Sequence, residues 1–191
     1  MCEASLDAHH GCQMTQSQKE VICFDEVVKQ YPIKKGFTLS SVDALFFEKQ
    51  EIFLVEFKNG CLASSNPCDF GFQCDLLQDL SDSKIKEKKK LRESNFRNEL
   101  LKKFYETMLA LINLDKNFSL EYFKNNATLI LVYNENKNDA RNQVAKSVNR
   151  GVNIQKFGLG YMKGYCCKNI YTYSVEEFDG FLKTNGFFLN K

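Results

Sequence analysis

The chain has 191 residues, of which 43% are hydrophobic and 26% are charged, and only two are proline. This is the profile of an ordinary globular protein, and the length is enough for one domain with a sizeable core. The net charge of +2 is too small for overall charge alone to hold the protein to a polyanion. No apolar run approaches the roughly 20 residues that cross a bilayer, and the N-terminus lacks the segments of a signal peptide. We therefore expect a cytoplasmic protein without a membrane-spanning segment.

Eight cysteines without a secretion signal indicate reduced thiols rather than a disulfide framework. Two groups of cysteine and histidine lack the paired C-x2-C spacing that predicts a zinc site. These groups are Cys61, Cys68 and Cys74, and Cys2, His9, His10 and Cys12. We expect Cys23, Cys166 and Cys167 to be small buried apolar residues.

The first part of the chain predicts a loose segment followed by a helix. Residues 1–14 are polar and unpatterned, and we expect 15–191 to form a single α/β domain. A helix is predicted over 15–31, because apolar residues recur there at helical spacing and Pro32 follows.

The next part predicts strands. Two apolar segments, 43–47 and 52–58, predict a hairpin, and GFTLS at 36–40 predicts a short strand before it. A long loop follows over 59–82, which suggests an insertion or a functional flap.

The second half predicts alternating helices and strands. An apolar stripe predicts a helix over 84–114, and the nearly uniform apolar segment 127–135 predicts a strand covered on both faces. A helix over 138–149, a strand over 169–174 and a last helix capped by Ser174 follow. The predicted fold is α/β, with a mixed β-sheet flanked by helices on both faces.

Three charged residues interrupt the apolar hairpin, and its register predicts that they meet. If the turn is centred between Lys49 and Gln50, opposed residues have numbers that sum to 99, and Asp43 faces Glu56. A slip of one residue would instead send Asp43 to the opposite face, and the apolar residues do not decide between the two registers because both faces are apolar. Opposed residues share a sheet face, and Lys58 shares it too because strand side chains alternate with period two. Two carboxylates side by side on a covered sheet require a nearby cation.

At these residues the sequence resembles the PD-(D/E)xK nuclease superfamily. VDA, with Asp43, takes the place of the PD element, and VEFK, with Glu56 and Lys58, takes the place of (D/E)xK. The resemblance covers roughly residues 15–135. It implies a restriction-endonuclease-like core of order αβββαβ and a metal-dependent nuclease that hydrolyses DNA or RNA.

The resemblance also implies roles for the residues of the motif. Asp43 and Glu56, with the backbone carbonyl of Phe57, would hold Mg²⁺ or Mn²⁺, hard cations that prefer oxygen ligands. Lys58 would orient or help to deprotonate the attacking water.

The family often adds a catalytic glutamate from its first helix. Glu20 and Glu26 are the candidates for this position. We favour Glu26, which follows an aromatic residue as it does in many members.

Basic residues on the helix over 84–114 are candidates for binding a nucleic acid partner. The predicted phosphate contacts are Lys88, Lys89, Lys90, Arg97 and Lys102. The alternative is that this basic run is only the solvated face of a helix.

Two other classes of function compete with a nuclease. One is a non-catalytic nucleic-acid-binding or protein-interaction module on the same fold. The other is an unrelated α/β interaction protein, in which Glu56 and Lys58 form an incidental surface ion pair and Asp43 lies at a fraying strand end.

Overall fold

The computed structural model describes residues 6–7, 12–15, 19–30, 39–59, 82–135, 157 and 159–186. Its centre is a five-stranded sheet in the order β3-β4-β5-β6-β7, with two antiparallel pairings followed by two parallel ones. The strands are β3 (Ile22–Cys23), β4 (Ala44–Glu48), β5 (Glu51–Lys58), β6 (Ala127–Tyr133) and β7 (Asn169–Ser174). The predicted α/β class with a mixed sheet is confirmed.

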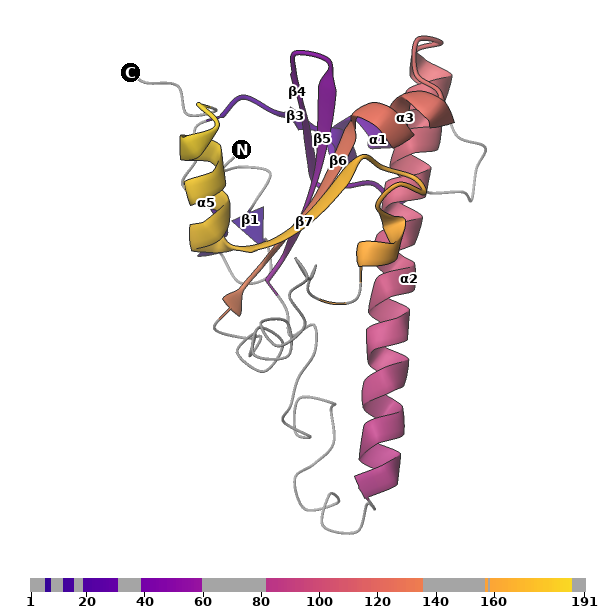
Figure 1. The fold of residues 1–191 in the computed structure, drawn as a ribbon, viewed down its shortest axis with the longest axis vertical. Coiled ribbons are helices and arrows are strands. Elements are labelled where there is room, and N and C mark those ends of the chain that lie inside the picture. Colours follow the sequence, from indigo (N-terminus) through magenta and orange to yellow (C-terminus); the bar gives the residue numbers. More distant parts are fainter. Residues whose placement is uncertain are drawn as a thin grey trace.

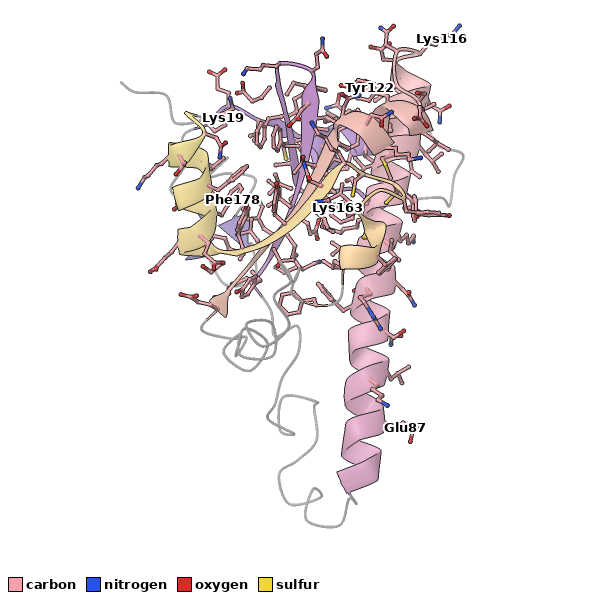
Figure 2. The ribbon with its side chains drawn as sticks, in the orientation of Figure 1. Lys19, Glu87, Lys116, Tyr122, Lys163 and Phe178 are labelled. Carbon is pink, nitrogen blue, oxygen red and sulfur yellow. The ribbon has the colours of Figure 1, made fainter. Side chains whose placement is uncertain are left out.

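Helices cover both faces of this sheet, as predicted. On one face lie α1 (Phe24–Gln30), the long α2 (Asp82–Leu114) and the short α3 (Leu120–Asn126), and on the other lies α5 (Val175–Thr184) (Figure 1). Phe178 of α5 points toward the sheet (Figure 2) and is fully buried there. Every residue of β6 is buried, which explains why this strand is almost uniformly apolar.

The hairpin has the predicted register. Leu45 pairs with Leu54, and Phe47 pairs with Ile52. The turn is formed by Lys49 and Gln50, and Lys49 takes a left-handed conformation with φ of 55°. The side chains of β5 therefore alternate between the α2 face and the α5 face as the sequence predicts.

The predictions for the start of the domain are wrong in two respects. The helix begins at Phe24 rather than at residue 15, because Ile22 and Cys23 pair with β4 as an edge strand. This edge position leaves Cys23 exposed, so the prediction that it is buried is also wrong. In the GFTLS segment, residues 36–38 lie outside the described residues, and the two residues that follow them form no strand.

The elements of the second half are mostly confirmed. The helix over 84–114, the strand over 169–174 and the last helix correspond to α2, β7 and α5, and the strand over 127–135 corresponds to β6. Ser174 and Glu177 form the predicted capping box. The predicted helix over 138–149 and nearly all of the loop over 59–82 lie outside the described residues. The structure adds α3, capped by Ser119, and a 3₁₀ turn, η6 (Gly160–Met162).

The remaining expectations concern the N-terminal segment, two cysteines and membrane-spanning helices. Within the N-terminal segment, β1 (Leu6–Asp7) pairs with β2 (Cys12–Gln13). Cys166 and Cys167 are buried free thiols. Across the part of the chain that the structure describes, no helix has the length and apolar composition needed to span a membrane.

Candidate functional site

The last residue before β4 and the end of β5 meet at one edge of the α2-facing side of the sheet. Asp43 lies one residue before β4, and its carboxylate Oδ2 accepts a hydrogen bond of 2.7 Å from the N–H of Phe57. Glu56 follows Ile52 and Leu54 along the face of β5 that packs against α2. Glu56 and Asp43 are thus brought to the same place by the hairpin register.

Glu56 is the most buried of the charged residues that meet at this edge. Its side chain has no exposed surface, and its Oε1 lies 2.9 Å from the Lys58 ammonium and 2.7 Å from the Lys103 ammonium. Its other oxygen, Oε2, is buried without a hydrogen-bond partner, and no other buried side-chain polar atom of the described residues lacks one. An unsatisfied buried polar atom is unfavourable by about 1–3 kcal/mol, and such atoms are rare in native structures.

Lys103 of α2 joins the two carboxylates. Its ammonium lies 3.6 Å from Oδ1 of Asp43 while it donates to Glu56. We call Asp43, Glu56, Lys58 and Lys103 the carboxylate–lysine cluster. The predicted convergence of the first three side chains on one face is observed, whereas their catalytic roles remain predictions.

Neighbouring charges shift the pKa values of Asp43 and Lys103. Burial and the nearby Glu56 raise the pKa of Asp43 to about 7, although Lys103 and the Phe57 N–H oppose the shift. Burial lowers the pKa of Lys103, but the attraction of Glu56 and Asp43 outweighs it, so that this pKa is raised. Lys103 therefore stays charged and acts as the counter-ion of two crowded carboxylates.

Side chains of α2 and α1 hold the segment that carries Asp43. The N–H of Ser40 donates to Glu106 at 2.5 Å, and the N–H of Val42 donates to Thr107 at 3.0 Å. The hydroxyl of Ser41 donates to Asp25. These contacts place Asp43 on the side of α2 from which Lys103 projects.

The structure does not bring Glu26 to the cluster. The Glu26 carboxylate pairs with Lys29 at 2.5 Å, and its side chain is 61% exposed. Glu20 lies before the helix and is exposed. The first-helix carboxylate near the cluster is Asp25, whose charge contributes to the raised pKa of Asp43. Glu26 therefore does not face the cluster in this structure, and the α1 carboxylate whose charge reaches Asp43 is the preceding residue, Asp25.

The predicted phosphate contacts lie on α2 outside the cluster. Lys90 is exposed, and the side chains of Lys88 and Lys89 lie outside the described part of the chain. They belong to the N-terminal half of α2, which extends beyond the sheet and carries the exposed Glu87 (Figures 1 and 2). Nucleic-acid binding by this half of the helix remains a prediction.

Two further predicted contacts lie closer to the sheet. Arg97 is close enough to Tyr161 to oppose the burial that raises the pKa of that tyrosine. Lys102 is exposed and lies 3.9 Å from Glu106. The lysine that enters the site is instead the next one, Lys103. Its spacing of three residues from Leu100 and seven from Phe96, both buried, is the signal that places it on the sheet side.

The cluster offers oxygen atoms of the kind that hold a hard divalent cation. Oε2 of Glu56 is unpartnered, and Asp43 supplies a second carboxylate. The described residues contain no group of three or more histidine, cysteine, aspartate and glutamate side chains suited to a metal. Among the described residues, the backbone is the nearest source of a third oxygen ligand beside these two carboxylates.

The backbone carbonyl of Phe57 faces the side of β5 where Asp43 lies. The Phe57 N–H points to Asp43, whereas the Lys58 carbonyl accepts from Asn134 on the β6 side. N–H and C=O of one strand residue point the same way, and successive residues alternate, so the Phe57 carbonyl points toward β4. Val42, opposite Phe57 in the register, donates its N–H to Thr107 instead of to the sheet.

A separate surface cavity of about 740 Å³ lies at the opposite end of the sheet. It is lined by the hairpin turn, the first residues of β6 and β7 and the end of α5. It contains no residue of the carboxylate–lysine cluster, and the chemistry of the cluster does not depend on it.

Comparison of the chain with family models, with curated proteins and with solved structures finds no match. The resemblance to the PD-(D/E)xK superfamily accordingly stays a prediction carried by Asp43, Glu56 and Lys58.

Proposed function

We propose that this protein is a metal-dependent nuclease, a phosphodiesterase that hydrolyses DNA or RNA at the carboxylate–lysine cluster. Asp43 and Glu56 would hold Mg²⁺ or Mn²⁺ together with the Phe57 carbonyl, and Lys58 would act on the attacking water. One observation carries the proposal: Glu56 is fully buried beside a second carboxylate and keeps one oxygen without a partner.

The cluster fits a hard divalent cation in its donor chemistry. Two carboxylates and a carbonyl are oxygen ligands of the type that Mg²⁺ and Mn²⁺ accept. When bound, such a cation supplies a water of lowered pKa and neutralises charge on phosphate oxygens. A partner for Oε2 of Glu56 would also remove the unfavourable burial of that atom.

The position of Lys58 supports a role in acting on a water at the rim of the site. It is the last residue of β5, its side chain is 28% exposed, and its ammonium is held 2.9 Å from Oε1 of Glu56. An ammonium fixed in this way can orient a water by hydrogen bonding and offset the negative charge that develops on a phosphate. Because the Lys58 side chain is partly exposed, its ammonium can reach solvent, whereas the fully buried Glu56 cannot.

The order of elements supports a restriction-endonuclease-like core. A helix is followed by an antiparallel hairpin, a long helix and a strand parallel to the second hairpin strand, which matches most of αβββαβ. The departure is β3, because this edge strand precedes α1 instead of following it.

A second candidate function is a non-catalytic binding module on the same fold. Lys103 favours it, because this ammonium already lies against both carboxylates and compensates their charge without a metal. In this case the cluster would serve stability, and any nucleic acid would bind through the basic residues of α2.

Cleavage of labelled single- and double-stranded DNA and RNA tests the proposal. Wild-type protein should cleave at least one substrate with Mg²⁺ or Mn²⁺, and EDTA should abolish cleavage. Lys58→Ala should lose about 10²–10⁴-fold in rate, which is the usual contribution of a positioned acid–base group. It should still fold, because Glu56 keeps Lys103 as a partner.

The matched control is Lys168→Ala, which removes a lysine paired with Glu51 at the opposite end of the sheet. It should cleave at the wild-type rate. Equal loss in both variants would contradict a specific role for Lys58. Absence of both cleavage and metal-induced stabilisation in the wild type would favour the binding module.

A further inference from the structure

Lys103 is the residue of the cluster that the motif does not contain. Its ammonium lies 2.7 Å from Oε1 of Glu56 and 3.6 Å from Oδ1 of Asp43, so that it touches both carboxylates of the proposed cation site. Its side chain is 25% exposed, which gives it room to move toward solvent. Lys58, by contrast, forms its ion pair with Glu56 and with no other carboxylate of the described residues.

The contact between Lys103 and the carboxylates is built by the fold. Buried Leu100 and Phe104 fix the face of α2 that meets the sheet, and Thr107, one turn further along, binds the Val42 N–H. The chain just before Asp43 is therefore attached to the same helix that carries Lys103. The ammonium and the two carboxylates are held together from both sides.

A divalent cation and this ammonium cannot both bind the same carboxylates at contact distance without strong repulsion between like charges. We infer that Lys103 is a built-in competitor of the divalent cation. In the metal-free protein its ammonium neutralises Asp43 and Glu56, and it leaves them when Mg²⁺ or Mn²⁺ binds. This inference rests on the proposed function, since it assumes that Asp43 and Glu56 are the ligands.

Competition has two measurable consequences. Removing the Lys103 charge should strengthen cation binding, because the cation no longer displaces a bound ammonium. The same change should lower the stability of the metal-free protein, because Asp43 and Glu56 lose a shared counter-ion and only Lys58 remains beside Glu56. A lysine with a merely structural role would produce the second effect without the first.

Isothermal titration calorimetry of the full chain with Mn²⁺ separates these cases. Lys103→Met should tighten Mn²⁺ binding by roughly 5- to 150-fold, the usual range for coupling between two sites. The matched control is Lys102→Met, which removes the same charge one residue away on α2. Because Lys102 is 59% exposed and pairs with Glu106 rather than with Asp43 or Glu56, its change should be less than about threefold.

Lys103→Arg keeps the positive charge. It provides a second test of the inference if the methionine variant does not fold. A guanidinium can bridge both carboxylates, so this variant should bind Mn²⁺ no more tightly than the wild type. Thermal melts in EDTA should give a lower midpoint for Lys103→Met than for Lys102→Met.

Each result has a definite meaning. If wild type and Lys103→Met bind Mn²⁺ with equal affinity, the inference is overturned while the proposed cation site stands. If neither variant of Lys103 nor the wild type binds Mn²⁺, the proposed cation site and the inference both fail. If Lys102→Met tightens binding as much as Lys103→Met, the effect comes from the loss of a positive charge at long range. Direct competition by Lys103 is then refuted.

Discussion

Replacement of Asp43 by asparagine should stabilise the metal-free protein at pH 8 and leave its stability nearly unchanged at pH 4. Burial and the charge of Glu56 raise the pKa of Asp43 from 3.8 to about 7, so the ionised carboxylate is unfavourable in the folded state. Asparagine removes this charge and keeps an oxygen that can accept the Phe57 N–H.

The size of the effect follows from proton linkage. Below the unfolded pKa of 3.8, Asp43 is protonated in both states and carries no charge. Between pH 4 and about 7 the folded protein keeps a proton that the unfolded chain releases, so the free energy of unfolding falls as the pH rises. A shift of about three pKa units, at about 1.36 kcal/mol each, corresponds to about 4 kcal/mol lost above pH 7. This is an upper value, because the Asp43 side chain is 20% exposed.

Urea unfolding in EDTA at pH 4, 6 and 8 measures this effect. The stability difference between Asp43→Asn and wild type should be small at pH 4 and should grow with pH toward several kcal/mol, up to the about 4 kcal/mol linkage limit. The control is Glu26→Gln, which removes an exposed carboxylate of α1 and should follow the wild-type pH profile. A variant that is no more stable than wild type at pH 8 would show that the ionised Asp43 carboxylate does not destabilise the folded state.

Two further predictions concern α2. Replacing the lysines at 88–90 by glutamine should weaken nucleic-acid binding and reduce its salt dependence. The slope of the logarithm of the binding constant against the logarithm of the salt concentration should fall by about 0.7–0.9 for each phosphate that is no longer neutralised. Unchanged binding and slope would show that this run is only a solvated helix face. Thr107→Val should leave the buried N–H of Val42 without its acceptor, which lowers the free energy of unfolding by about 1–3 kcal/mol and loosens Asp43. Urea unfolding and Mn²⁺ titration measure both effects, and wild-type values in both would contradict this role for Thr107.

The meeting of Asp43, Glu56 and Lys58 could be predicted because it depends only on local rules. Strand side chains alternate with period two, and a short turn fixes which residues oppose each other. Both faces of the two segments are apolar, so hydrophobicity alone does not exclude a slip of one residue, and the observed pairing of Leu45 with Leu54 decides the register. The same local reasoning found α2, β7 and the capping box of α5.

Lys103 could not be predicted in the same way, because it comes from a helix 47 residues beyond Glu56. Neighbouring helix positions differ by about 100° around the axis, so the choice between Lys102 and Lys103 depends on how α2 is oriented against the sheet, which the sequence does not determine. Glu26 is favoured over Glu20 because of the family resemblance, and Asp25 is not among the candidates. The two-residue strand β3 is too short to show a period, and missing it misplaced the start of α1.

A crystal soaked in Mn²⁺ shows directly whether Asp43 and Glu56 hold a divalent cation. Anomalous scattering locates manganese without reference to any assumed mechanism. We expect an anomalous peak between the two carboxylates, with the Phe57 carbonyl turned to it and the Lys103 ammonium withdrawn from both. A crystal at saturating Mn²⁺ with no peak there, and with Lys103 still against Asp43 and Glu56, would contradict the proposed cation site.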